Sequence, residues 1–536
     1  MFALGILIGI YSYSLFILGI LYLLYPIPVV LVTIAWIGGV VYWFKKDKTF
    51  TSKNLKRLFT SFPNLSTFSK ICVVLVMVLW GINLIGALAP EISFDALWYH
   101  LTIPKIFINN HSFFYIQGGL YYYSLMPKLV DMLYVPSVMV HTAPFAKLIH
   151  LTFGVLTLIA LYFLSRRFVS QSVSFFILLL FSANLVVAWE ATTAYIDLGR
   201  TFFEVMAVYG LVLYLQEKKR LWLTESAVMI GFAIATKVVA ITSLPFFLIF
   251  IFLLYRKNIQ KAITVCIKYG VITLAIPLPY WIFSLLSSGN PFYPIFTQYV
   301  QFDIPTNILS ITAFIQHFWQ LFVHAADPIN PIYILVFPWI FIVFKKFSFY
   351  EKIFVLYVGI NLVITYFLVS SRETRYLLPY LPILSLLTGI TIIKIPNKLV
   401  KKICFGLGIG IAVTTIGYRA IASSTYIPVV FGMESRDQYL TKTLDYSFGD
   451  FYDTDGYFAQ TLTKDDTVLV YGIHNLYYAN FPFIHESYAK SGDEFNYILA
   501  PTDMILPSRF YAWKITYSNP VTNVTLYSQE GNTWVY

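Results

Sequence analysis

The 536-residue chain is too apolar to be an ordinary soluble globule, because 58% of its residues are hydrophobic, 12% are charged and its mean hydropathy is +0.71. Its formal net charge of +11 would suggest nucleic acid as the partner of a soluble protein. Here the basic residues fall in short clusters between apolar runs, so membrane orientation explains them better and no nucleic-acid partner is expected. The composition predicts an α-helical polytopic membrane protein, with the lipid bilayer as its surroundings.

Residues 1–70 are predicted to form an N-terminal transmembrane hairpin and a cytoplasmic loop. The opening apolar run from Met1 lacks a basic segment and is followed directly by a second run over Ile27–Phe44. An anchored hairpin therefore fits this region better than a cleaved signal peptide. Basic residues between positions 45 and 57 mark the loop as cytoplasmic.

Residues 71–422 are predicted to form the main transmembrane domain. Stretches such as Ile71–Ala89 and Phe145–Phe163 are long enough to cross a bilayer, which takes about 20 apolar residues. Counting such runs against the basic clusters predicts about 13 helices in the whole chain, a cytoplasmic N-terminus and an extracytoplasmic C-terminus. The chain is therefore expected to be a multi-pass protein of the plasma or inner membrane. The later basic clusters lie at residues 166–167, 218–220, 256–257, 345–346 and 398–402.

Two outward loops, at about residues 90–144 and 287–331, are longer than simple connections require, and long ordered loops usually carry function. The first contains two amphipathic pieces, Asp95–Asn109 and Ser124–Tyr134, with the pattern of helices that lie in the membrane interface. Its first part also contains two carboxylates, an imidazole and an amine directly after an apolar run: Glu91, Asp95, His100 and Lys105. Ionisable groups beside a spanning helix are costly, so this cluster is a candidate functional site.

Residues 423–536 differ sharply in composition and are predicted to form a small extracytoplasmic α/β domain. Glu434–Leu444 has helical spacing, and three segments are predicted as strands, namely Thr467–Tyr471, Asn496–Ala500 and Val524–Tyr527. The three cysteines, Cys72, Cys266 and Cys404, all lie in predicted spans. The outward domain must therefore fold by packing without disulfides, and no cysteine metal site is available.

Five motifs in a fixed order resemble those of the GT-C superfamily of membrane glycosyltransferases, in particular the aminoarabinose and protein O-mannosyl transferases. The resemblance covers roughly Ile71–Ala422. The motifs are Phe94-Asp-Ala-Leu-Trp-Tyr-His-Leu-Thr-Ile-Pro-Lys105, Thr193-Ala-Tyr-Ile-Asp-Leu198, Gly231 to Thr236-Lys237, Gly289-Asn-Pro-Phe-Tyr-Pro294 and Arg375-Tyr-Leu-Leu-Pro379.

This resemblance implies a catalytic domain over residues 71–422 with an extracytoplasmic active site. It implies a polyprenyl-phosphate sugar as donor, an extracytoplasmic lipid, glycan or protein as acceptor, and an acidic residue of the first outward loop as general base. Asp95 occupies that place, and Glu91 is the candidate for a second catalytic acid. Asp95 also fits a helix N-cap, a role that does not exclude catalysis.

Transfer from a lipid phosphate also needs cations where the leaving group gains charge. The candidates for binding the donor phosphate are Lys105, Arg375, Arg372 and Lys237, and those for supporting the substrate site are His100, Tyr99, Asp197 and Tyr376. Simpler interpretations stay open: Lys105 can snorkel to the headgroups, the arginines can anchor helix ends, Asp197 can be a solvated connector charge, and His100 can be ordinary polar surface rather than a ligand.

No metal site is predicted, although a divalent ion as cofactor stays open. Asp453-Thr-Asp455 imitates a metal-binding Asp-x-Asp motif, but it lies in the outward domain and fits an acidic turn better. The alternative function is a transporter or flippase of a lipid-linked saccharide, which predicts an internal repeat that the sequence lacks. A non-enzymatic assembly or sensor protein is a third possibility, and it leaves the Asp95 loop unexplained.

Overall fold

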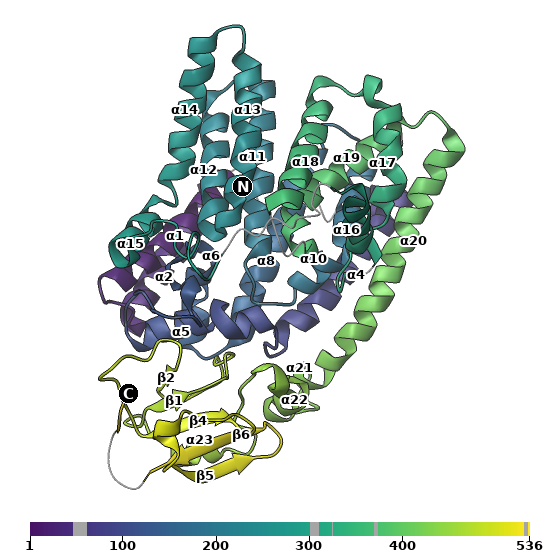
Figure 1. The fold of residues 1–536 in the computed structure, drawn as a ribbon. Helices are drawn as coiled ribbons and strands as arrows, with labels where there is room; N and C mark the ends of the chain where they lie inside the picture. The colour runs from purple at the N-terminus through teal and green to yellow at the C-terminus, as the bar shows by residue number, and fades with distance from the viewer. Residues whose placement is uncertain (47–61, 301–309, 324, 369–372, 530–533) are drawn as a thin grey trace.

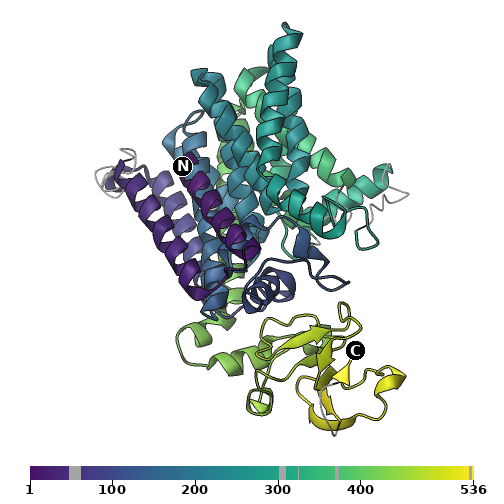
Figure 2. The same cartoon turned by 90° about the vertical axis from the view of Figure 1, so that its left-hand side faces the viewer.

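The computed structural model describes residues 1–46, 62–300, 310–323, 325–368, 373–529 and 534–536. A bundle of long helices is covered at one end by short helices and, beyond them, by a small sheet domain formed by the C-terminal part of the chain (Figures 1 and 2). Most of the predicted cytoplasmic loop, residues 47–61, lies outside the described residues.

Within the described ranges, nine helices are long and apolar enough to cross a membrane, or ten if a bent pair is counted as one span. The nine are α1 (Phe2–Ile20), α2 (Pro26–Lys46), α4 (Thr67–Leu88), α8 (Ala143–Ser165), α11 (Asp197–Glu217), η5 (Val238–Ser243) with α13 (Leu244–Tyr255), α18 (Phe349–Leu368), η7 (Thr374–Tyr380) with α19 (Leu381–Lys394), and α20 (Lys398–Ser423) continued by η8 (Ser424–Tyr426) and α21 (Ile427–Val430). The predicted helical membrane class is confirmed.

The predicted number of about 13 spans is not confirmed, because several apolar runs form short or broken helices. The bent pair consists of α14 (Ile259–Ala275) and α15 (Leu278–Ser288), which meet at 60°. Proline at position 277, directly before α15, cannot donate the backbone hydrogen bond that a continuous helix needs. The shorter helices are α9 (Gln171–Ser182), α12 (Arg220–Thr236) and α17 (Ile332–Ile342).

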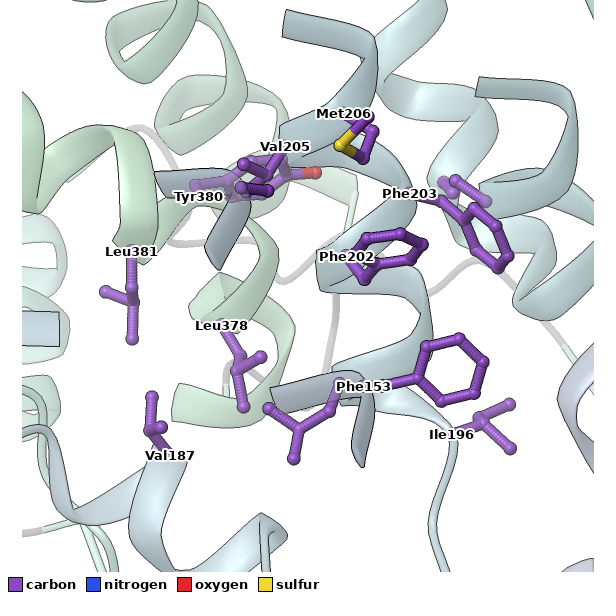
Figure 3. Close-up of a cluster of buried hydrophobic side chains, with 14 of the residues drawn as sticks. Phe153, Val187, Ile196, Phe202, Phe203, Val205, Met206, Leu378, Tyr380 and Leu381 are labelled. Atoms are coloured by element: carbon purple, nitrogen blue, oxygen red, sulfur yellow. The ribbon is translucent and has the colours of Figure 1, made fainter. Parts of the chain in front are cut away.

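Helix α11 lies at the centre of the bundle. Of its apolar 18-residue stretch 94% is buried inside the protein, compared with only 6% of the corresponding stretch of α2. Phe202 and Phe203 of α11 pack with Phe153 of α8, and Leu378 of η7 and Leu381 at the start of α19 lie nearby (Figure 3). Helix α11 contacts α8, α12 and η7, so it connects these three elements within the bundle.

The first outward loop forms short helices that lie between the bundle and the sheet domain (Figure 2). They are η3 (Ala96–His100), α5 (Thr102–Asn109), η4 (Tyr122–Leu125), α6 (Leu129–Leu133) and α7 (Val135–Met139). Part of the second predicted outward loop, residues 301–309, lies outside the described residues, and α16 (Ile311–Val323) follows it. The remaining short elements are η2 (Phe62–Asn64), α10 (Leu185–Glu190) and η6 (Phe344–Lys346).

The C-terminal part contains a mixed five-stranded sheet in the order β2-β1-β4-β6-β5. Strand β1 pairs in parallel with β2 and β4, and β6 pairs antiparallel with β4 and β5. The predicted helix and the three predicted strands are confirmed as α22, β1, β4 and β6. The elements of this part are α22 (Arg436–Thr443), η9 (Tyr446–Phe448), α23 (Tyr457–Thr461), β1 (Val468–Val470), β2 (Phe483–His485), β3 (Glu494–Phe495), β4 (Tyr497–Pro501), η10 (Ser508–Phe510), β5 (Lys514–Asn519), β6 (Val524–Ser528) and β7 (Trp534–Val535).

Backbone contacts attach the sheet domain to the first outward loop. The N–H of Gly119 donates to the carbonyl of Ser487 at 3.3 Å, and the N–H of Leu120 donates to the Ser487 hydroxyl at 3.0 Å. Gly118 has φ +102°, and a Cβ there would stand 1.7 Å from the Ser487 carbonyl oxygen. A glycine at position 118 is therefore required both by its backbone conformation and by the close approach of the sheet domain.

We expect Gly118→Ala to loosen this attachment, because the new methyl group cannot fit without moving one chain away from the other. Gly492→Ala is the matched control: its φ is +100°, but a Cβ there meets nothing within 4 Å. Both variants have the strain of a positive φ, and only Gly118→Ala adds overpacking, which costs about 1–3 kcal/mol. Limited proteolysis of the purified full chain should cleave residues 423–536 faster in Gly118→Ala than in Gly492→Ala, and equal rates would contradict the close contact.

Candidate functional site

Asp95 and Arg375, which lie 280 positions apart in the sequence, form an ion pair beneath the sheet domain. Oδ2 of Asp95 accepts from Nη1 of Arg375 at 2.5 Å and from the hydroxyl of Tyr99 at 2.9 Å. Asp95 stands at the N-cap position of η3, yet its side chain makes no capping hydrogen bond. Its carboxylate is thus directed to the arginine and the tyrosine instead of to the helix end.

A second ion pair lies close by, where α12 ends and α11 begins. Nζ of Lys237 contacts Oδ1 of Asp197 at 2.7 Å and lies 4.8 Å from the centre of the Tyr376 ring. The same ring lies 5.5 Å from the guanidinium carbon of Arg375, so Tyr376 neighbours both cations. The side chains of Lys237 and Arg375 keep 20% and 17% of their surface exposed, which leaves both cations accessible to an anionic ligand.

Glu91 is fully buried and binds backbone groups. One of its carboxylate oxygens accepts from the N–H groups of Ile92 and Ser93 at 2.9 and 2.8 Å, and the other accepts from the N–H of Ala194 at 2.6 Å. These contacts connect the first outward loop to the segment that leads into α11. The structure therefore places this carboxylate on backbone N–H groups and not beside Arg375, where Asp95 lies.

His100 and Lys105 are also directed away from the ion pair of Asp95. Nδ1 of His100 contacts Oδ1 of Asp131 at 2.6 Å, and Nζ of Lys128 lies 3.4 Å from the other oxygen of that carboxylate. Among the described residues, no group of three or more His, Cys, Asp or Glu side chains is arranged to hold a metal ion. His100 thus belongs to a buried polar cluster that supports the loop.

Lys105 contacts the sheet domain. Its Nζ donates to the carbonyls of Tyr477 and Ala479 at 2.7 and 2.5 Å, and burial lowers its pKa to about 8. Both hydrogen bonds are directed to that domain, so the ammonium attaches the domain to the loop, and the donor-phosphate role of Lys105 stays a prediction. Arg372, another candidate for that role, lies outside the described residues.

Two residues of the site were missed by reasoning from the sequence. The hydroxyl of Tyr195 accepts from the N–H of Asp95 at 3.2 Å, and the Tyr195 ring lies 5.8 Å from the guanidinium carbon of Arg375. Glu190 is fully buried, with neither carboxylate oxygen hydrogen-bonded in the described part of the chain. Its position at the end of an apolar run was the available signal, since a buried acid at a membrane boundary is costly.

Comparisons with known proteins agree with the predicted fold. The family model described as dolichyl-phosphate-mannose-protein mannosyltransferase matches residues 142–283. Two solved structures of ArnT from Cupriavidus metallidurans, one bound to undecaprenyl phosphate and one in the apo state, match with TM-scores of 0.55 and 0.57. Each match has 13% sequence identity and covers 85% of this chain and 97% of the ArnT chain.

A search of curated proteins found no match to the chain. The segment matched by the family model begins at the end of the first outward loop and runs through α8, α11, α12 and α14, whereas the structural likeness covers 85% of the chain. The predicted resemblance to the aminoarabinose and protein O-mannosyl transferases is thus confirmed by the family model and by the fold, which the chain shares with ArnT.

Proposed function

We propose that this protein is a membrane glycosyltransferase that transfers a sugar, hexosyl or pentosyl, from a polyprenyl-phosphate donor to an extracytoplasmic acceptor. The observation that carries the proposal is a carboxylate, Asp95, in contact with one of two partly exposed cations, Arg375 and Lys237, at one end of a GT-C fold. A carboxylate can take a proton from an alcohol, and cations beside it can stabilise a phosphate.

The reaction needs these two kinds of group at the same place. An acceptor hydroxyl attacks the anomeric carbon from the face opposite the lipid phosphate, and the anomeric C–O bond breaks with its electron pair passing to the phosphate oxygen. Asp95 takes the hydroxyl proton, so that a new glycosidic bond forms with inversion at the anomeric carbon. Asp95 is the general base in this proposal, whereas Glu91 positions the loop because its oxygens are already bound to backbone N–H groups.

Arg375 has a double role in this scheme. Its guanidinium contacts Asp95 at 2.5 Å and, through Nε, Glu373 at 2.6 Å, and Glu373 is half exposed. A donor phosphate competes with both carboxylates for the planar fork of the guanidinium, which suits bidentate contact with phosphate. When the guanidinium turns to the phosphate, it leaves Oδ2 of Asp95 free to accept the proton, so donor binding prepares the base.

Lys237 is the second proposed phosphate ligand. Its pairing with Asp197 and its place near the Tyr376 ring hold the ammonium beside the same ring that Arg375 contacts. Asp197 therefore serves as the positioning partner of Lys237. Tyr376 supports the two cations, and Tyr99 supports the base by its hydrogen bond to Asp95.

The proposed orientation follows from the distribution of charge. The basic cluster 218–220 lies at the end of α11 far from the site, whereas Asp197 begins the same helix. By the positive-inside rule, the sheet domain and the site then face the extracytoplasmic side of a plasma or inner membrane, and the N-terminus faces the cytoplasm. Residues 1–70, 71–422 and 423–536 are the proposed hairpin, catalytic domain and outward domain.

Asp95→Asn should abolish transfer, because the amide keeps the shape of the side chain but cannot accept the proton. General-base catalysis contributes typically 10²–10⁴-fold, and we expect a loss of about that size in kcat. The measurement is release of polyprenyl phosphate by the purified protein supplied with a polyprenyl-phosphate sugar and an acceptor extract of the host membrane. Asp465→Asn, the same change at an exposed position of the outward domain, is the control. Full activity in Asp95→Asn would refute the assigned base.

Arg375→Lys should separate phosphate binding from proton transfer, because lysine keeps the charge and loses the planar fork. Loss of one donor to a developing oxyanion costs about 10²–10³-fold in kcat. Binding of sugar-free polyprenyl phosphate should weaken in Arg375→Lys, and it should be unchanged or tighter in Asp95→Asn, where a negative charge beside the phosphate is removed. Arg509→Lys, at an exposed position of the outward domain, serves as the control. Unaltered affinity in Arg375→Lys would show that the guanidinium does not bind the phosphate.

A further inference from the structure

A cavity of about 800 Å³ lies between α11, α12, α13 and α14, far from the site described above. In Figure 1 the ends of α13 and α14 project from the bundle on the side opposite the sheet domain. Four cations line this cavity, and they come from three different helices or their ends: Lys218, Arg220, Lys261 and Lys268. Its lining includes no acidic residue.

These four cations have no acidic partner within the described ranges. The nearby carboxylate of Glu217 instead pairs with Arg167 and Lys219, which are not part of the lining. Nζ of Lys261 lies 4.7 Å from the centre of the Tyr255 ring, which orients the ammonium without neutralising it. The cavity therefore concentrates positive charge that no acidic side chain of the described ranges compensates by an ion pair.

Lys261 and Lys268 are seven residues apart on α14 and so share one face of the helix, about 10 Å apart along its axis. The other face of α14 exposes apolar side chains, among them Ile263, Ile267 and Val271, which are 48%, 58% and 62% exposed. Lys268 is thus a charge in the middle of an apolar helix with a lipid-facing side. A lysine there is costly and indicates a binding function.

The same cavity has an apolar wall as well as its cations. Leu223 and Leu254 line it from α12 and α13, and Val265 and Ile272 line it from the face of α14 that also contains the two lysines. A soluble anion would use only the cations. An amphiphile with a phosphate head and hydrocarbon tails would use both surfaces.

We propose that this cavity binds the headgroup of an anionic phospholipid, with its phosphate held by Lys261, Lys268, Lys218 and Arg220 and its hydrocarbon against the apolar wall. Basic pockets between spanning helices bind such headgroups by charge, and the arrangement places the lipid at the membrane face opposite the proposed catalytic site. The site is distinct from the one for the sugar donor, and it does not depend on the proposed enzymatic activity.

The test uses the purified full chain in neutral detergent and follows thermal unfolding during titration with phosphatidylglycerol, phosphatidylcholine or inorganic phosphate. Phosphatidylglycerol should stabilise the wild type, because a ligand that binds the folded state raises its apparent stability. In Lys261→Gln/Lys268→Gln the midpoint of that titration should move to a concentration roughly tenfold higher or more. Glutamine in an apolar helix costs less than lysine, so folding of this variant is preserved.

Lys345→Gln/Lys346→Gln is the matched control, since it removes the same charge from another predicted cytoplasmic cluster outside the cavity. The control should keep the midpoint of the wild type, and phosphatidylcholine should produce no comparable shift. An equal midpoint in both double variants would overturn the proposal. Stabilisation by inorganic phosphate at the same concentrations would also overturn it, because the cavity would then be a site for a soluble anion.

Discussion

Pairing of charges at the membrane boundary is the constraint on which the arrangement of this protein depends. An unpaired ionised side chain in such surroundings is strongly destabilising, whereas a partner from another element offsets much of that penalty. Asp95 with Arg375 connects the first outward loop to η7, and Asp197 with Lys237 connects α11 to the end of α12. One turn into α11, Arg200 contacts Glu204 at 2.7 Å and donates to the Tyr380 hydroxyl at 2.7 Å. These polar contacts fix the positions of η7, α11, α12 and the loop relative to one another.

The same constraint explains why the proposed active site can respond to its ligand. Arg200 and Glu204 are fully enclosed and also bind tyrosine or serine hydroxyls, so their ion pair is structural. Arg375 and Lys237, by contrast, keep part of their surface exposed. In the proposed mechanism an incoming phosphate replaces a carboxylate at these two cations, so that each cation keeps a negatively charged partner. Exchange of one anion for another is less costly than breaking an ion pair.

The sequence was sufficient to predict residues and elements that have a local signal, namely reactive side chains within a motif or a regular pattern of apolar residues. Asp95 and Arg375 were both predicted as functional from motifs, and the fold brings them into contact; the strands around Leu469, Ile498 and Leu526 followed from alternating and buried patterns. Lys105 could not be placed in this way, because its partners are backbone carbonyls more than 370 positions away. Counts of apolar residues were also not enough to determine the number of spans, because a proline bend and short helices divide the apolar runs. Long-range partners and broken helices have no local signature.

The sheet domain contacts the very residues that flank the proposed base, which gives it a direct influence on the site. Phe94, the residue before Asp95, packs against Phe448 and His474 of the C-terminal part at ring separations of 5.1 and 6.0 Å. The hydroxyl of Tyr478 donates to the carbonyl of Glu91 at 2.7 Å, while the carboxylate of Glu91 binds the N–H of Ala194 near the start of α11. A single buried acid thus links the outward domain, the loop and the central helix. Because the loop is held from both sides, displacement of the sheet domain would move Asp95 relative to Arg375, and an acceptor that contacts this domain would act on the geometry of the base itself.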